Sequence, residues 1–229
     1  VPMLRDFLGA GHWSRIEGGV YSYIERILER FKGDVLLDAH VACIQRSSRG
    51  VQLEMANGET LPFDAVVFAT TPDQVLRLLA DPSQAETRRF GAWESQPATT
   101  VVHTDDGLYR RRGIRYPSEF DLFETASGAH GYNAYLNRLT GLTDEGVAHY
   151  QLAFNLDEEI DPGCVVHVQR HTSPRYTVES FRHRDEVIAT NGENHTFHVG
   201  AYLGDGLHEG AVRSASTVSR LLGGREIRY

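Results

Sequence analysis

Hydrophobic residues recur at helical spacing in two parts of the chain, residues 20–31 and residues 211–222. Apolar side chains three and four positions apart lie on one face of a helix, so both stretches predict amphipathic helices. The stripes consist of Val20, Tyr23, Ile24, Ile27, Leu28 and Phe31 in the first helix, and of Ala211, Ala215, Val218 and Leu222 in the second. Gly33-Asp34 follows the first stripe and Gly223-Gly224 follows the second, and each predicts where its helix ends.

Shorter apolar runs between these helices predict strands. Residues 35–38 and 41–45 are strand-like, residues 50–55 alternate, and Asn57-Gly58 is a hairpin signal. The run 64–72 is continuously apolar, as in a buried parallel strand. Asp73 is a predicted cap for a following helix through Leu79. A three-stranded meander that leads into a buried strand is a regular adjunct of dinucleotide-binding domains.

The middle of the chain has a different pattern. Four strand-like runs are separated by polar turns rich in glycine, aspartate and proline, and they cover residues 99–104, 133–139, 150–155 and 165–171. This pattern predicts a mixed or antiparallel sheet inserted within the first domain. The expected fold class is therefore α+β.

Composition and charge narrow the function. The 229 residues are 41% hydrophobic and carry a net charge of −8, without a basic stripe, which argues against nucleic acid as a partner and favours a small-molecule substrate. No apolar run is long enough for a membrane span, and no signal peptide is visible. Two cysteines, Cys43 and Cys164, fit a reduced, cytoplasmic protein better than a disulfide framework. Nothing in the sequence indicates an oligomeric state.

The stretch before the last helix is the main candidate for chemistry. A short apolar run at residues 197–199 is followed by glycines 200, 204 and 206 and then by the helix. Glycines allow a ligand to approach the backbone closely, and a helix N-terminus presents free N–H groups and a positive dipole end. The stretch could hold an anion or a polarised oxygen. On spacing alone, an ordinary tight connection between strand and helix is the simpler interpretation.

The run Gly206-Leu207-His208-Glu209-Gly210-Ala211-Val212 resembles the C-terminal flavin-binding segment of the FAD-dependent amine oxidase superfamily. The resemblance implies that the backbone N–H groups at the start of the last helix face O2 of the flavin. It also implies the adenine contact of a strand valine, here Val41. The implied FAD contacts are Val41, Gly200, Ala201, Gly204, Asp205, Gly206, Leu207, His208 and Val212.

Further segments resemble the same superfamily in the same order. Residues 13–19 are similar to its double-glycine segment, and residues 63–70 to the next-to-last strand of its flavin domain. Parts of the middle resemble a bacterial subgroup of amine-oxidase-like FAD/NAD-binding proteins. We therefore expect an FAD-binding domain built from residues 12–82 and 192–224, with a substrate domain at residues 83–191.

Two departures from the superfamily change the expected function. No Gly-x-Gly-x-x-Gly turn for the FAD pyrophosphate occurs, so we expect this chain to be the C-terminal portion of a longer protein, and to be inactive and unable to retain FAD alone. Leu207 stands where amine oxidases carry an aromatic residue, although Tyr202 could replace it. The full-length protein is expected to oxidise a small or lipid-like substrate with FAD. The alternative is a cofactor-free binding or assembly module.

Other residues carry weaker signals, and no catalytic residue is assigned. His167 and His171 are four apart, and His195 and His198 three apart, but neither pair supplies the ligands of a zinc site, so no metal is expected. His103 could line the substrate cavity, although a surface position at a strand end fits the sequence better. The two tryptophans, Trp13 and Trp93, are predicted to be packing residues.

Overall fold

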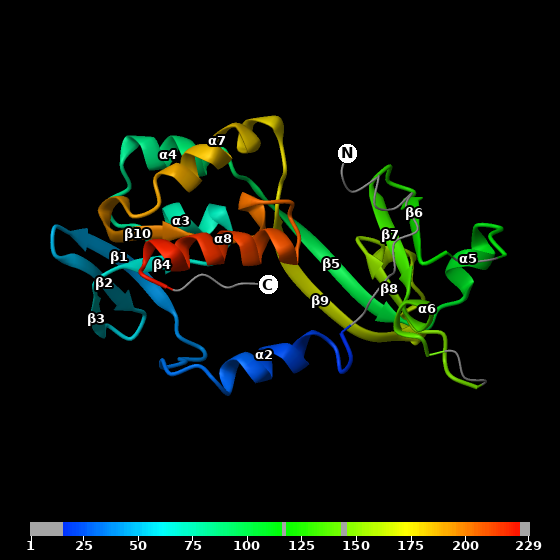
Figure 1. Ribbon diagram of the computed structural model, residues 1–229. Coiled ribbons are helices and arrows are strands. Elements are labelled where there is room, and N and C mark those ends of the chain that lie inside the picture. The colour runs from blue at the N-terminus through cyan, green and yellow to red at the C-terminus, as the bar shows by residue number, and fades with distance from the viewer. Residues whose placement is uncertain (1–15, 116–117, 143–145, 225–229) are drawn as a thin grey trace.

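The computed structural model describes residues 16–115, 118–142 and 146–224, so Trp13 and the start of the predicted first domain lie outside the described residues. The chain forms two parts that are joined by a pair of long strands (Figure 1). One part contains a three-stranded sheet, a two-stranded parallel sheet and most of the helices, and the other is a five-stranded antiparallel sheet. This arrangement confirms the predicted α+β class.

The first part begins with an antiparallel meander, and its strands are β1 (Val41–Ser47), β2 (Gly50–Met55) and β3 (Thr60–Phe63). The predicted hairpin signal forms the turn between β2 and β3, where Gly58 has a φ of +85° and Asn57 Oδ1 accepts from the N–H of Glu59. Residues 35–38 do not form the strand predicted for them. They have no neighbouring strand to pair with among the described residues.

A parallel pair of strands brings together two segments that lie far apart in the sequence. These strands are β4 (Val66–Phe68) and β10 (Thr196–His198), and the N–H of Val199 extends the ladder by donating to the carbonyl oxygen of Phe68. The sequence of β4 is apolar throughout, as is typical of parallel strands, although only Phe68 is buried and Val67 is 42% exposed.

The described residues contribute five α-helices outside the five-stranded sheet and its connections: α2 (Val20–Leu28), α3 (Pro72–Leu78), α4 (Gln84–Gly91), α7 (Val178–Ala189) and α8 (His208–Leu221). The predicted helices α2, α3 and α8 are all present. Thr71 is the N-cap of α3, so Asp73 lies in the first turn and pairs with Arg77 rather than capping the helix. Figure 1 shows α2 apart from the other helices, and none of its residues is buried.

The second part is an antiparallel sheet with the strand order β6-β7-β8-β5-β9. Its strands are β5 (Ser95–His103), β6 (Phe120–Glu124), β7 (His130–Tyr135), β8 (Gln151–Phe154) and β9 (Val165–Pro174). The sequence did not indicate β6. It also predicted a strand through residue 139, whereas Leu136–Thr140 form helix α6 and Gly141 ends it with a left-handed φ of +67°.

Short helical elements complete the chain: α5 (Gly107–Arg111), η1 (Asp157–Glu159), η2 (Pro162–Cys164), η3 (Glu193–His195) and η4 (Ala201–Leu203). Helices α4 and α7 lie on either side of the five-stranded sheet in sequence, yet they pack against each other in the first part. The predicted boundaries of the substrate domain, at residues 83 and 191, remain a prediction. The sheet itself occupies residues 95–174.

Two of the three hydrophobic clusters among the described residues form the main cores of the two parts. The larger cluster fills the first part and consists of Ile44, Val51, Phe68, Val75, Leu79, Phe90, Trp93, Val187, Tyr202 and Leu203. The second lies on one face of the five-stranded sheet and consists of Val101, Leu108, Tyr109, Phe123, Ala153, Leu156 and Ile160. Trp93 is buried in the first cluster, as predicted for a packing residue. Cys43 and Cys164 are free, and no described helix has the length and apolarity of a bilayer span.

An almost buried ion pair ties β1 to α4. The Arg46 guanidinium donates to both carboxylate oxygens of Glu86, at 2.6 and 3.0 Å, and Glu86 also closes the capping box with Ser83 at the start of α4. Burial by itself would raise the pKa of Glu86, but the hydrogen bonds from Arg46 and Ser83 lower it from 4.5 to about 2. The charged pair is therefore part of the folded state at neutral pH.

We predict that Glu86→Gln lowers the free energy of unfolding at pH 7 by about 3 kcal/mol, because the buried Arg46 loses its two-oxygen carboxylate partner and keeps only the half-exposed Asp81. Since the folded-state pKa is depressed, this stabilisation is complete above pH 4.5 and is lost as the pH falls toward 2. Urea titrations of both proteins at several pH values measure it.

Glu94→Gln is the matched control, because Glu94 forms an exposed ion pair with Arg175. Its expected cost is below about 1 kcal/mol. Equal losses for the two variants would contradict the assignment of the Arg46–Glu86 pair as a stabilising contact.

Candidate functional site

The connection from β10 to α8 is a compact loop whose glycines meet specific steric demands. Gly206 has a φ of +82°, a left-handed value that favours glycine. A Cβ on Gly204 would lie 2.6 Å from the Cα of Gly210, so the loop backbone packs directly on the first turn of α8. The close approach that the sequence predicted for these glycines is therefore, at Gly204, an approach to the chain's own backbone.

Asp205 fixes the start of α8. Its Oδ1 accepts from the N–H of Leu207 at 2.9 Å and from the N–H of Gly210 at 3.1 Å. A carboxylate at this end of a helix is stabilised by the dipole and satisfies N–H groups that have no partner within the helix. The N-cap residue itself is Leu207, whose side chain cannot accept a hydrogen bond.

Two N–H groups at the start of α8 remain available. Among the described residues, no acceptor contacts the backbone N–H of His208 or Glu209, the first two residues of the helix. Both side chains are exposed. The helix thus presents two adjacent donors at its positive end, as expected for a site that holds an anion or a polarised oxygen.

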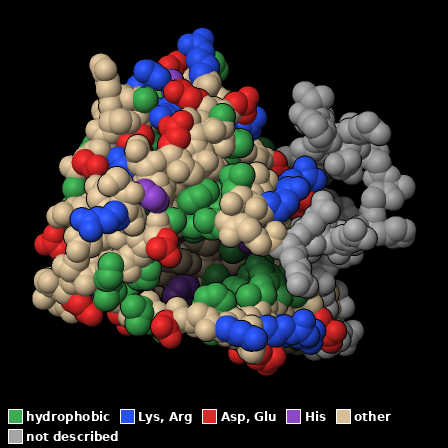
Figure 2. Space-filling view, turned by 60° about the vertical axis from the view of Figure 1, so that its left-hand side comes forward, with side chains coloured by type: hydrophobic (Ala, Val, Ile, Leu, Met, Phe, Trp, Pro, Cys, Tyr) green, Lys and Arg blue, Asp and Glu red, His purple; other side chains and the backbone are tan. Residues whose placement is uncertain are grey.

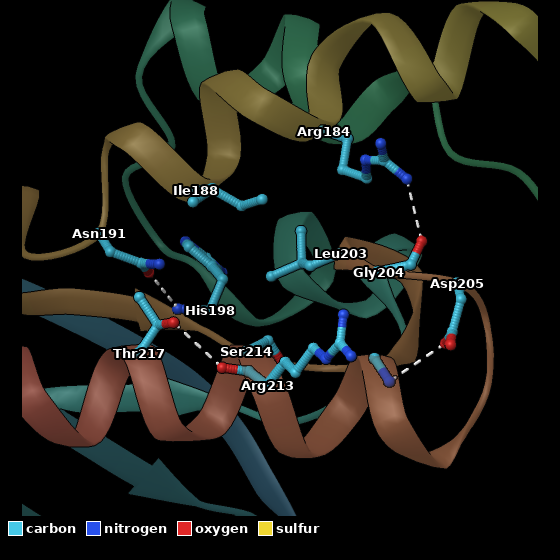
Figure 3. Close-up of a pocket in the computed structure, with 11 residues that line it drawn as sticks. Arg184, Ile188, Asn191, His198, Leu203, Gly204, Asp205, Arg213, Ser214 and Thr217 are labelled. Atoms are coloured by element: carbon cyan, nitrogen blue, oxygen red, sulfur yellow. Dashed lines mark hydrogen bonds between the residues drawn. The ribbon is translucent and has the colours of Figure 1, made fainter. Parts of the chain in front are cut away.

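A cleft of about 430 Å³ lies between α7 and α8 beside this loop (Figure 3). Gly204 and Asp205 border it at one end, and His198 lies at its inner side. The His198 ring is buried between Phe68 and Phe90, with centroid distances of 5.5 and 4.7 Å. Burial lowers the pKa of His198 to about 4, so its imidazole is neutral at physiological pH.

The predicted FAD contacts fall into two groups. Most lie together in one loop and the first turns of α8: Gly200, Ala201, Gly204, Asp205, Gly206, Leu207, His208 and Val212. Val41 lies elsewhere, at the start of β1, and packs against the larger hydrophobic cluster. Leu207 is half-exposed, whereas Tyr202 is only 3% exposed and packs edge-on against Trp93. Tyr202 therefore faces the core and does not take the place of an exposed aromatic residue.

A buried polar network in the five-stranded sheet was not predicted. His103 is fully buried, which overturns its expected surface position. The N–H of Asp105 donates to its Nδ1, so Nε2 carries the proton and donates to Asn133 Oδ1 at 2.9 Å. Asn133 in turn donates to Tyr109 and Gln151. This network could not be recognised from the sequence, since its members come from four separate elements.

The other face of this sheet is apolar and open. Strand register places Leu122, Tyr132 and Phe154 in one row and Phe120, Ala134 and Leu152 in the next. Leu122 is 84% exposed and Phe120 is 49% exposed, while Tyr132 stacks on Phe154 at 5.1 Å. Such surface normally contacts a ligand or another protein segment. A separate hollow with hydrophobic side chains along its walls appears in Figure 2, which brings forward the side of the molecule formed by the first part.

No described group of three or more histidine, cysteine or acidic side chains could hold a metal ion. His167 and His171 share a face of β9, and His195 lies in η3, away from His198 in the buried strand β10.

Residues 3–159 match the family described as flavin containing amine oxidoreductase. The chain belongs to this family. No curated protein matches it. Among solved structures, similarity extends to a fatty acid isomerase from P. acnes that produces CLA (TM-score 0.58, 12% identity, 88% of this chain and 52% of that chain).

Two further solved structures are similar to the chain. Putrescine oxidase bound to putrescine gives a TM-score of 0.57 at 13% identity, over 90% of this chain and 53% of that one. A protein from Exiguobacterium sp. assigned as a protoporphyrinogen oxidase gives 0.60 at 18% identity, over 96% and 54%. At these identities the likeness concerns the fold alone. The chain spans about half the length of each of these family-like structures.

We predict that Asp205→Ala destabilises the protein by about 1 kcal/mol, because two N–H groups at the start of α8 lose their acceptor. Asp205→Asn keeps an oxygen at the same position and should retain most of the stability. Thermal unfolding followed by circular dichroism measures both variants. An equal loss in the asparagine variant would show that charge, rather than the hydrogen bonds, stabilises this turn.

Proposed function

We propose that this chain supplies the flavin-facing part of an FAD-dependent oxidoreductase and that the start of α8 holds the pyrimidine end of the cofactor. The observation that carries the proposal is the pair of unused N–H groups on His208 and Glu209. Fixed donors aimed at a position where negative charge develops favour the charged form without reorganisation. Membership of the flavin family supports FAD as the ligand.

The neighbouring residues fit this role. The backbone at Gly206 and Leu207 leads to the two donors, and Asp205 holds the turn in place through Oδ1. The remaining predicted contacts, Val41, Gly200, Ala201, Gly204 and Val212, stay proposals for the same cofactor. Bound FAD would supply the acceptor for a hydride removed from the substrate.

We further propose that this chain alone neither retains FAD nor is active. Its sequence contains no Gly-x-Gly-x-x-Gly pattern, which in dinucleotide-binding domains supplies the main anion site for the FAD pyrophosphate. The parallel sheet among the described residues has two strands, and Val67 at its centre is 42% exposed. Parallel sheets are normally covered on both faces, so this exposure fits a domain of which part is supplied by other residues.

The substrate we propose is small or lipid-like and largely apolar. The open face of the five-stranded sheet offers aromatic and aliphatic side chains, with Leu122 and Phe120 exposed beside the stacked rings of Tyr132 and Phe154. An apolar wall contributes binding energy to hydrocarbon but discriminates poorly between polar groups. Leu207 at the position of an amine oxidase aromatic residue further argues against an amine.

The absorption spectrum of the full-length protein tests the proposed cofactor. We expect the visible bands of a bound flavin in the full-length protein, and no flavin bound in stoichiometric amount to the 229-residue chain. A colourless full-length protein that also fails to bind added FAD would overturn the enzyme proposal. That result would favour the alternative, a cofactor-free binding or assembly module. A yellow 229-residue chain would contradict only the proposal that it cannot retain FAD.

His208→Pro tests the donor at the start of α8. Position N1 of a helix tolerates proline, and Leu207 before it has the extended backbone that a following proline requires, with φ −118° and ψ −179°. The variant loses the N–H but keeps the helix. We expect the flavin potential of the full-length protein to fall by about 30 mV, equivalent to a tenfold loss of preference for the reduced form.

His208→Ala is the matched control, because it removes the imidazole and keeps the N–H. Its potential should equal that of the wild type in a spectroscopic titration against a reference dye. If the alanine variant shifts the potential and the proline variant does not, the side chain rather than the backbone acts on the flavin.

A further inference from the structure

His103 is the last residue of β5 and is completely buried within the five-stranded sheet. Its Nδ1 accepts from the backbone N–H of Asp105 at 3.1 Å, and its Nε2 donates to Oδ1 of Asn133 at 2.9 Å. Only a neutral imidazole can make both bonds, because a second ring proton would place an N–H donor on Nδ1 against the N–H of Asp105. A change of charge at His103 therefore breaks a contact of the folded sheet.

One path of hydrogen bonds leads from His103 through Asp105 to α5. Asp105 is buried, and its carboxylate accepts from the N–H of Gly107 at 2.7 Å and from the guanidinium of Arg111 at 2.8 Å, the first and last residues of α5. The same carboxylate accepts from the N–H of Asp161 at 3.1 Å, at the N-cap of η2. The position of Asp105 thus fixes both ends of α5 and the start of η2.

A second path leads from His103 through Asn133 to the same helix. The amide nitrogen of Asn133 donates to Oη of Tyr109 at 3.0 Å, and this hydroxyl donates to Asp121 at 2.9 Å. Tyr109 and its neighbour Leu108 are the residues of α5 in the hydrophobic cluster of the sheet. A helix of five residues is not stable by itself in water, so α5 depends on these contacts.

Two carboxylates lie close to His103, and both already have hydrogen-bond partners. The carboxylate of Asp105 accepts the three hydrogen bonds described above, and that of Asp106 lies 3.2 Å from Nδ1 of the exposed His149. Burial lowers the pKa of His103, and this effect outweighs the hydrogen bond to Asn133 and the attraction of the two carboxylates.

The other elements around His103 contribute no direct acceptor for a second ring proton among the described residues. On β9 the residue paired with His103 is Val165, and β8 contributes the uncharged Gln151. The remaining titratable groups reach His103 only through other residues of the network, and they are Tyr109 and Arg111 of α5, Asp121 of β6, and Glu159, Asp161 and Cys164 of the η1–η2 segment. A proton on Nδ1 therefore requires the turn at Asp105 to move.

We propose that His103 is a pH-sensitive switch and that protonation of its Nδ1 releases α5 and the start of η2 from the five-stranded sheet. The proton comes from water and forms an N–H bond on the ring. This new donor displaces the N–H of Asp105, so the turn at residues 104–107 moves and the contacts of its carboxylate are lost. The hydrophobic cluster under α5 then becomes accessible to water.

The direction of the pH dependence follows from the two protonation states of His103. Its pKa in the closed sheet lies below the ordinary value of about 6.5, so the closed form binds fewer protons than the opened form. The contact is fully formed above about pH 6.5 and weakens as the pH falls below that value. At pH 5 the charged form of an opened His103 exceeds the neutral form about thirtyfold, which favours opening by up to the same factor.

Hydrogen exchange of the purified chain at pH 7 and pH 5, measured by mass spectrometry and corrected for intrinsic rates, tests the proposal. We expect the protection of residues 104–112 to fall at least tenfold at pH 5, while β1 and β2 keep theirs. These strands are the internal reference, because Glu86 stays ionised and paired with Arg46 at both pH values. Equal protection of residues 104–112 at the two pH values would overturn the proposal, and so would an equal loss in β1 and β2.

His103→Asn identifies the titrating group. An asparagine oxygen can replace Nδ1 as the acceptor for Asp105 and does not titrate, so we expect equal protection at pH 7 and pH 5. His149→Gln is the matched control, because it removes an exposed imidazole that pairs with Asp106, and the response to pH should remain.

A response to pH that persists in the His103 variant, or that disappears in the His149 variant, would overturn the assignment to His103. If the asparagine variant does not fold, the wild type and the His149 variant still test the switch, because both must lose protection at residues 104–112.

Discussion

The parallel pairing of β4 with β10 is the constraint on which the other features of this chain depend. It joins residues from the two ends of the sequence, with Phe68 beside His198, and the whole five-stranded sheet is inserted between them. Once β10 lies beside β4, the loop at Gly204 must turn back over the same core. Helix α8 then begins where the strands end, which is where open α/β sheets bind ligands.

The start of α8 combines two requirements that compete for the same N–H groups. Asp205 takes those of Leu207 and Gly210 and thereby stabilises the turn, while those of His208 and Glu209 stay available. A loop that satisfied all of them internally would be more stable without a ligand and could bind nothing. This division is the physical basis of the proposed flavin contact at the start of α8.

The two parts of the chain use buried polar groups differently. In the first part, the Arg46–Glu86 pair is charged and joins a strand to a helix. In the sheet, the imidazole of His103 is neutral, since burial lowers its pKa. Both of its ring nitrogens are hydrogen-bonded, to Asn133 and to the N–H of Asp105. A satisfied network of this kind favours one arrangement of the strands over others, because any shift in register leaves buried groups without partners.

The sequence by itself determined the local elements: the Asn57-Gly58 turn, the apolar stretch of β4 and the glycine-rich entry to α8 all depend on neighbours along the chain. The same holds for the α+β class and the resemblance to flavin oxidases. Tertiary structure alone decided that residues 35–38 are not a strand, that Leu136–Thr140 form a helix and that His103 is buried. It also decided the cleft between α7 and α8. Each of these depends on contacts between residues far apart in sequence, which spacing along one segment cannot encode.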